Sequence, residues 1–191
     1  MTTLKNLVNN WHTDKDTVHS YLDLYNNLLL DKKNTAKNVL EVGIQHGGSI
    51  KLWSDFFTNA TVHGLDITNG SNIVSDIKNN DKIILYTDTD AYNEDNFNRL
   101  FLNNGLKFDF LLDDGPHTLE SMIQFINLYS KVMTDDGILI IEDVQDISWI
   151  ETLKNAVPEE LKQYIFVYDL RTCKDRYDDI VFSINKTMKQ V

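Results

Sequence analysis

Two apolar runs of this sequence end in acidic side chains. The first reads FDFLLDDGPH, and the second reads ILIIED. Short apolar runs bounded by turn residues predict buried strands, and parallel sheets place their chemistry outside the carboxyl ends of such strands. If the two strands are neighbours, one crevice collects five side chains that could do chemistry: Asp113, Asp114, His117, Glu142 and Asp143.

The residue types in this crevice indicate metal-assisted proton chemistry. Asp114, Glu142 and Asp143 offer the hard oxygen ligands that Mg²⁺ prefers, and a bound metal lowers the pKa of a hydroxyl. His117 lies at the start of the next predicted helix and could accept the hydroxyl proton as a neutral imidazole. The competing interpretation is that Asp113 or Asp114 caps this helix and that the other acids are solvated loop ends.

A glycine-containing loop follows the first predicted strand and starts a helix. It contains Glu41, Gly43, Gly47 and Ser49. Glycines allow a tight turn and the close approach of a ligand to the main chain, and a helix N-terminus offers free N–H groups. Because Gln45 takes the middle glycine position of the G-x-G-x-x-G pattern, an ordinary glycine turn of an α/β protein stays open as the alternative.

Asp66 ends the second predicted strand. A carboxylate at this place can accept hydrogen bonds from both hydroxyls of a ribose. Its negative charge suits an unphosphorylated ribose and would repel a 2′-phosphate. Together with the glycine loop, Asp66 predicts a nucleoside pocket; the alternative is an exposed aspartate that caps the strand end.

Composition narrows the classes of partner. The chain has 191 residues, 42% of them hydrophobic and 25% charged, and a net charge of −11. This acidity argues against nucleic acid as a partner. A single cysteine, Cys173, excludes a disulfide framework within the chain. No apolar run is long enough for a membrane span and the N-terminus has no apolar signal region, so we expect a cytoplasmic protein that does not bind membranes.

The order of elements that must position these residues alternates between strand and helix. Such alternation predicts an open α/β sheet with helices on both faces. The link 169–179 is too short for a crossover helix, so the last two strands are expected to be antiparallel. The apolar pattern predicts strands at 38–42, 61–65, 83–86, 108–112, 138–141, 164–168 and 180–184, and helices at 50–57, around 97–101, at 118–132 and at 147–157.

The N-terminal part, residues 1–36, is predicted to be a helical extension of a single domain at 37–191. Apolar residues recur at spacings of three and four from Val18 to Leu29, which is typical of an amphipathic helix that Thr13 or Asp14 could cap. On this helix, His19 and Tyr21 are interpreted as helix-face residues, with membership of the site as the alternative.

These motifs resemble the class I S-adenosylmethionine-dependent methyltransferases. The segments VLEVGIQHGGSIKLW, VHGLDI, FDFLLDDGPH and ILIIEDV carry the resemblance. More narrowly, they and the flanking segments TDKDTVHSYLDLY and VYDLRTCKDRYDDIVFSI resemble the metal-dependent sugar O-methyltransferases of macrolide biosynthesis, the mycinamicin and tylosin type. The resemblance implies a Rossmann-like sheet of seven strands, with the last strand antiparallel and inserted beside the fifth.

The resemblance also implies roles for individual residues. The cofactor would be S-adenosylmethionine, the metal Mg²⁺, and the acceptor a hydroxyl of a sugar or glycoside; a homo-oligomer stays open. Glu41 and Gly43 would lie by the methionine part of the cofactor and Asp113 near its amino group. Asp66 would hold the ribose. The remaining roles implied are adenine contact by Asp88 and Thr89, metal binding by Asp114, Glu142 and Asp143, and proton abstraction by His117.

Three other functions remain alternatives to this reading. A metal-independent N- or O-methyltransferase would use the acids to contact its substrate directly. A non-catalytic α/β protein would keep the nucleoside pocket for binding alone, although such a protein has no need of the acidic cluster. A dinucleotide oxidoreductase would bind a nicotinamide cofactor instead of S-adenosylmethionine.

Overall fold

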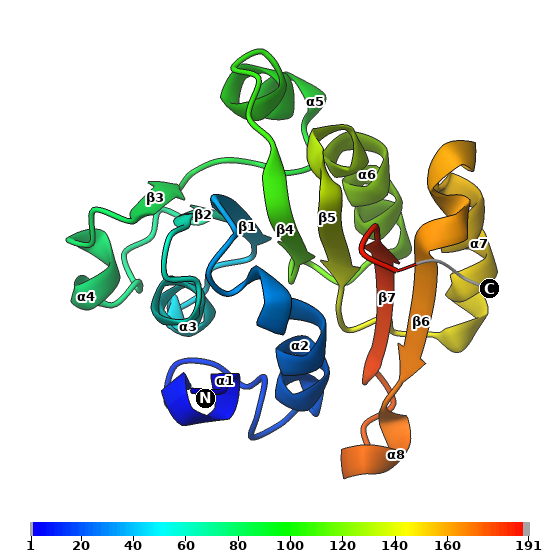
Figure 1. Cartoon of the computed structure of the whole chain (residues 1–191), viewed down its shortest axis with the longest axis horizontal. Helices are drawn as coiled ribbons and strands as arrows, with labels where there is room; N and C mark the ends of the chain where they lie inside the picture. Colours follow the sequence, from blue (N-terminus) through cyan, green and yellow to red (C-terminus); the bar gives the residue numbers. More distant parts are fainter. Residues whose placement is uncertain (1, 189–191) are drawn as a thin grey trace.

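Seven apolar segments pair into one sheet in the computed structural model, which describes residues 2–188 (Figure 1). The strands are β1 (Asn38–Val42), β2 (Thr61–Leu65), β3 (Ile83–Tyr86), β4 (Phe108–Asp113), β5 (Met133–Ile141), β6 (Ile165–Asp169) and β7 (Ile180–Asn185). Their order across the sheet is β3-β2-β1-β4-β5-β7-β6. β1 to β5 pair in parallel, and β7 runs antiparallel to both of its neighbours, β5 and β6. The predicted sheet, including its inserted last strand, is therefore confirmed.

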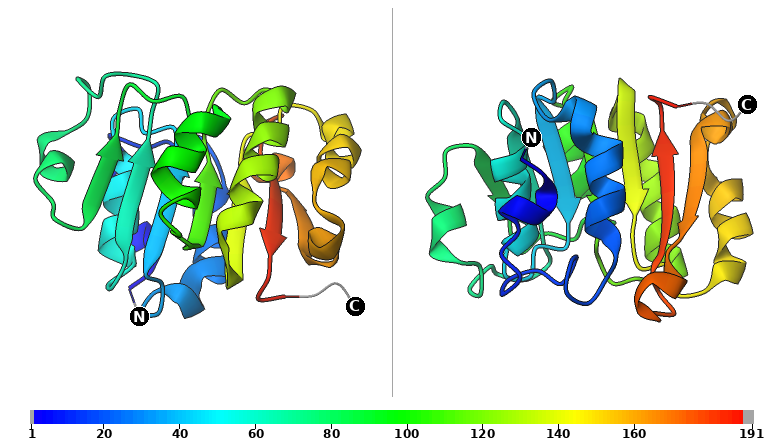
Figure 2. Two further views of the ribbon diagram at one scale, coloured as in Figure 1. Left: turned by 90° about the horizontal axis from the view of Figure 1, so that it is seen from above. Right: turned by 60° about the horizontal axis from the view of Figure 1, so that its bottom comes forward.

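Helices cover both faces of this sheet (Figure 2). The α-helices are α1 (Leu4–Leu7), α2 (Tyr21–Leu29), α3 (Gly48–Phe56), α4 (Ser75–Lys78), α5 (Glu94–Phe97), α6 (Leu119–Tyr129), α7 (Ile150–Ala156) and α8 (Arg171–Lys174). Shorter 3₁₀ or π segments are Leu30–Lys32, Asn98–Leu102, Ser130–Val132, Ile147–Trp149 and Glu159–Tyr164. Within residues 2–188, none of the helices has the length and apolar character to cross a membrane.

The alternation of side chains along the strands divides the core into two apolar layers. Phe110 and Leu112 of β4 face α1, α2 and α3. Leu111, between them, faces α5, α6 and α7. Successive side chains of a strand point to opposite faces, and both faces here are covered. This explains why β4 reads as a continuous apolar run rather than an alternating one.

The N-terminal helix is shorter than the sequence pattern predicts. α2 begins at Tyr21 with Ser20 as its N-cap, so the expected start near Thr13 or Asp14 is wrong. The N–H group of Val18 donates to the carbonyl of Asp14, in a turn that precedes the helix. Val18 is 40% exposed and does not belong to the buried face. The turn allows a polar side chain, Lys15, to enter the interior, where it is only 1% exposed.

Candidate functional site

A cavity of about 490 Å³ opens at the carboxyl ends of β1, β2 and β4. The loop after each of these strands supplies part of its wall, and Asp14 of the N-terminal segment contributes from another side. The lining residues are Asp14, Val42, Gly43, Gln45, Leu65 to Thr68, Asp90 to Tyr92, Asp114 to His117, and Asp143. Of the five side chains expected in one crevice, Asp114, His117 and Asp143 line this cavity, and Asp113 and Glu142 do not.

Asp66, on the wall of this cavity, is held by four hydrogen bonds. One carboxylate oxygen accepts the N–H groups of Ile44 (2.8 Å) and Gln45 (3.1 Å). The other accepts the N–H and hydroxyl groups of Thr68, both at 2.8 Å. Burial alone would raise the pKa of Asp66, but these donors outweigh burial and lower the pKa below its usual value. The charged carboxylate therefore joins the glycine loop to the end of β2.

Glycine is required where the glycine loop crosses the end of β4. A Cβ atom on Gly43 would lie 1.9 Å from the carbonyl oxygen of Asp114, and the φ angle of Gly43 is +89°. Further along the loop, Gly47 is the N-cap of α3 and Ser49 lies beside Glu41. A Cβ atom on Gly48 would meet the main chain of His12. The N-terminus of α3 is therefore covered by the N-terminal segment, and neither Gly47 nor Ser49 lines the cavity.

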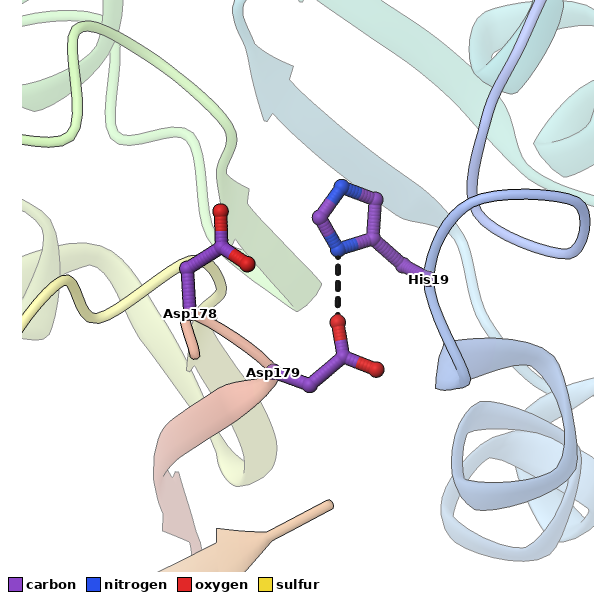
Figure 3. Close-up of side chains that lie close together, drawn as sticks. All are labelled: His19, Asp178 and Asp179. Atoms are coloured by element: carbon purple, nitrogen blue, oxygen red, sulfur yellow. Dashed lines mark hydrogen bonds and ion pairs between the residues drawn. The ribbon is translucent and has the colours of Figure 1, made fainter. Parts of the chain in front are cut away.

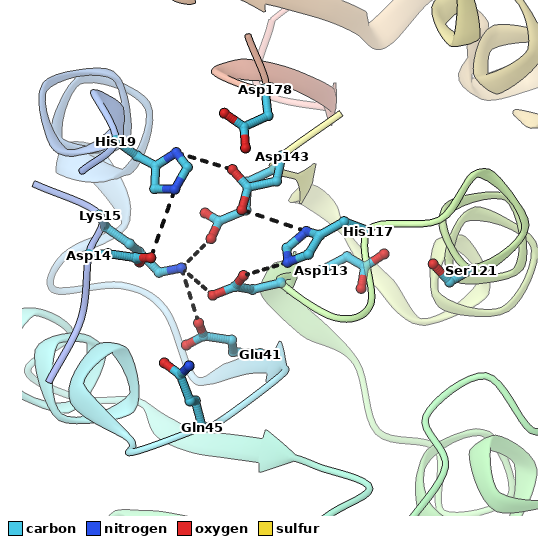
Figure 4. A network of polar contacts seen from close by, with 12 residues as sticks. Asp14, Lys15, His19, Glu41, Gln45, Asp113, His117, Ser121, Asp143 and Asp178 are labelled. Carbon is cyan, nitrogen blue, oxygen red and sulfur yellow. Dashed lines mark hydrogen bonds and ion pairs between the residues drawn. The ribbon is translucent and has the colours of Figure 1, made fainter. Parts of the chain in front are cut away.

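Asp114, His117 and Asp143 also line the cavity and lie together. A ligand atom from each lies within 4.8 Å of the others. The imidazole of His117 stands between the two carboxylates, with Nε2 3.7 Å from Oδ1 of Asp114 and Nδ1 3.6 Å from Oδ2 of Asp143 (Figure 4). His117 and Asp143 have φ angles of 53° and 55°. Such left-handed backbone at non-glycine residues costs energy and is concentrated at functional sites.

Glu142 lies behind this group, and its carboxylate faces buried donors. One of its oxygens accepts a hydrogen bond from the ammonium of Lys15, and the other accepts one from the hydroxyl of Tyr25 at 2.5 Å. The same ammonium lies 2.6 Å from Oδ2 of Asp114 and 3.5 Å from Oε1 of Glu41, so it spans three carboxylates, as Figure 4 shows. Burial alone would lower the pKa of Lys15, but the carboxylates outweigh it and raise the pKa well above its usual value. Lys15 is therefore a permanent cation inside the site.

Burial dominates the pKa values of the other acids. It raises the pKa of Glu41 to about 7, against the opposing charge of Lys15. It also raises the pKa of Asp113 to about 7, although that carboxylate accepts the hydroxyl of Tyr92. The pKa values of Glu142 and Asp143 are raised by burial and by the neighbouring charge of Asp114.

Two of the predicted adenine contacts lie off the cavity wall. Asp88 and Thr89 do not line the cavity, and the wall after β3 is formed by Asp90 to Tyr92. The backbone of Thr89 donates instead to the carbonyl of Asp66, at 3.0 Å. Trp53 of α3 is completely buried and donates a hydrogen bond to Glu41 at 2.7 Å.

A second polar cluster adjoins the first and joins the N-terminal segment to the start of β7. Nδ1 of His19 lies 2.7 Å from Asp179, and Asp178 stands beside them (Figure 3). The same nitrogen is 3.3 Å from Asp143, whose other partner is the hydroxyl of Tyr21. His19 lies before α2 and is not on its face, whereas Tyr21 is the first residue of α2 and is buried. Both side chains contact carboxylates of these two clusters.

The order of the strands, with an antiparallel last strand between the fifth and the sixth, defines the class I methyltransferase fold. Among known proteins, the chain is similar to O-methyltransferases. It is 27% identical over 151 residues to mycinamicin VI 2''-O-methyltransferase of Micromonospora griseorubida. This alignment covers 75% of this chain and 36% of that protein. It is 27% identical over 154 residues to demethylmacrocin O-methyltransferase of Streptomyces fradiae. That alignment covers 76% of this chain and 37% of the relative.

The fold also matches solved structures. MycE methyltransferase from the mycinamycin biosynthetic pathway, in complex with Mg, SAH and mycinamycin VI, aligns with a TM-score of 0.75 at 19% identity, over 96% of this chain and 53% of that chain. The chain thus matches little more than a third of the length of its curated relatives. No family model matches it.

Proposed function

We propose that this protein is an S-adenosylmethionine-dependent O-methyltransferase, assisted by Mg²⁺, that acts on a hydroxyl of a sugar or glycoside. One observation carries the proposal. A single cavity is lined both by Asp66 and by the group of Asp114, His117 and Asp143. A nucleoside cofactor and an acceptor hydroxyl can therefore meet in one space. The sugar O-methyltransferases to which the chain is similar support this choice of acceptor.

The cofactor would occupy the end of the cavity formed by the glycine loop. Asp66 would accept the ribose hydroxyls, and Gly43 permits the close approach of the methionine part. Glu41 and Asp113 are too buried to line the cavity, so they would act on the methionine part from behind its wall. For the adenine, the segment Asp90 to Tyr92 supplies the wall in place of the two residues that precede it.

The donor set fits Mg²⁺ in its chemistry. Asp114 and Asp143 present hard oxygen atoms in one group with His117. Glu142 directly precedes Asp143 at the end of β5, and its oxygens are turned to Lys15 and Tyr25. Asp114, Glu142 and Asp143 would hold the metal. When bound, Mg²⁺ would orient the acceptor and favour the ionised form of its hydroxyl.

His117 would take the proton from the acceptor hydroxyl. The acceptor oxygen then attacks the methyl carbon of the sulfonium in line, the carbon–sulfur bond breaks, and S-adenosylhomocysteine leaves with the electron pair. The two carboxylates that flank His117 stabilise the imidazolium that forms. Because the sulfonium is already activated, positioning of the two reactants supplies most of the rate enhancement.

The charge of the cavity wall favours a neutral or cationic acceptor. Five of the lining residues are aspartates, and the lining that the structure describes includes neither lysine nor arginine. A phosphorylated acceptor would be repelled by this wall at the open side of the cavity. The proposed acceptor is therefore a glycoside or free sugar rather than a sugar phosphate.

Calorimetric titration with S-adenosylhomocysteine, in Mg²⁺ and in EDTA, tests the cofactor. We expect binding in both, and binding in neither would refute the proposal. A screen of glycosides with the wild-type enzyme then identifies an acceptor. His117→Ala and Asp114→Ala should each lower turnover by at least about 100-fold, as expected for loss of a general base or a metal ligand, and should keep the affinity for S-adenosylhomocysteine. Loss of that affinity in both variants would mean that these residues belong to the cofactor site.

A metal-independent methyltransferase is the second candidate. The observation that favours it is the ammonium of Lys15, which already forms ion pairs with Asp114 and Glu142 without a metal. Full turnover in excess EDTA would support this candidate over the first.

A further inference from the structure

Four buried rings lie in a row beneath the carboxylates of the site. His19, Tyr21 and Tyr25 come from the segment that leads into α2 and from α2 itself, and Trp53 comes from α3. Neighbouring ring centroids are 4.9, 5.7 and 6.2 Å apart along the row. We refer to these four residues as the aromatic row.

Each ring of the aromatic row directs its polar atom to a carboxylate. The pairs, in order along the row, are His19 with Asp179, Tyr21 with Asp143, Tyr25 with Glu142, and Trp53 with Glu41. These acids come from the ends of β1 and β5 and from the residue before β7. One row of donors from the N-terminal half therefore faces acids from three strands.

Packing alone does not account for the two tyrosines in this row. Both are completely buried, and a buried hydroxyl is costly unless it has a partner. A phenylalanine would fill the same space without that cost. Here the hydroxyls bond to Asp143 and Glu142, which are two of the three carboxylates assigned to the metal. The stacked neighbours prevent the rings from turning away, so the donors stay fixed in position.

We propose that Tyr21 and Tyr25 are positioning residues, which fix the carboxylates of Asp143 and Glu142 at the proposed metal site. This inference rests on the proposed function, since it needs the metal site. Groups that hold metal ligands by hydrogen bonds typically change metal affinity 10- to 100-fold when they are removed. Neither tyrosine lines the cavity, so neither touches the cofactor.

Binding of Mn²⁺ to Tyr21→Phe and Tyr25→Phe tests this role. Free Mn²⁺ is followed by electron paramagnetic resonance during titration of the full chain, without acceptor. We expect each variant to bind Mn²⁺ about 10- to 100-fold more weakly than the wild type, with unchanged affinity for S-adenosylhomocysteine. The matched control is Tyr129→Phe, because Tyr129 is also completely buried but donates to the carbonyl of Ala91.

The outcomes separate this inference from the function on which it rests. If the wild type binds Mn²⁺ and both tyrosine variants bind it equally well, the positioning role is wrong and the metal site stands. Equal weakening in Tyr129→Phe would show a general effect of losing a buried hydroxyl, which also refutes the role. If the wild type binds no Mn²⁺, both the metal site and the inference fail.

Discussion

Replacement of Lys15 by methionine should destabilise the protein strongly. The ammonium of Lys15 is 1% exposed and contacts Asp114 and Glu142. Removing one partner of a buried ion pair costs about 3–5 kcal/mol, because the other charge stays buried without a counter-ion. For a chain of this size, 1 kcal/mol shifts the Tm by about 2–4 °C. The expected loss in Tm is therefore roughly 6–20 °C.

Thermal denaturation in EDTA measures this effect, since no divalent cation can then replace the lost charge. The matched control is Lys32→Met. The side chain of Lys32 is 4% exposed, but its partner Asp136, at 3.0 Å, is 68% exposed and stays solvated when the lysine is lost. We expect this variant to lose less than about 1 kcal/mol. Equal losses in the two variants would refute the reasoning, since burial of the lysine chain would then account for both.

Two further predictions concern residues outside the carboxylate cluster. Gly43→Ala should lower the free energy of unfolding by about 2 kcal/mol or more, because of the left-handed φ of Gly43 and the clash of the added Cβ with Asp114. Denaturant titrations measure this loss. Gly105→Ala is the control for the backbone part, since Gly105 has a φ of +65° and no atom lies within 4 Å of the added Cβ. Burial lowers the pKa of His63 from 6.5 to about 4. The unfolded chain therefore binds a proton that the folded chain does not, and stability should fall by on the order of 3 kcal/mol as the pH drops from about 6.5 to 4. The stability of His63→Phe should not show this part of the fall with pH. If the difference in stability between this variant and the wild type stays constant with pH, the prediction is wrong.

The strands could be predicted closely because their signal is local. β1, β2 and β3 have the predicted limits, since each is an apolar run between polar turns. β5 starts earlier than predicted, at Met133, because its first residues pair through an irregular register with Phe108. Such pairing depends on the partner strand, which a run of residue types does not reveal.

The crevice could be predicted, but the residues behind it could not. Asp114, His117 and Asp143 follow apolar strands, so the sheet itself brings them together. Lys15 lies 127 residues from Glu142 in the sequence, and nothing in its own segment indicates this contact. Tyr21 and Tyr25, four residues apart, gave a usable signal: two aromatic residues with polar tips on one buried helix face need acceptors.

The same long separations constrain how the site can form during folding. His19 pairs with Asp179 across 160 residues, and Asp179 immediately precedes β7, which inserts between β5 and β6. Asp179 is therefore in place beside His19 only when the last strand has paired. Contacts of such sequence separation form late, because the chain must first close a long loop. A partly folded chain without β7 would lack the Asp179 partner at this end of the aromatic row, so the complete carboxylate site is a property of the finished sheet alone.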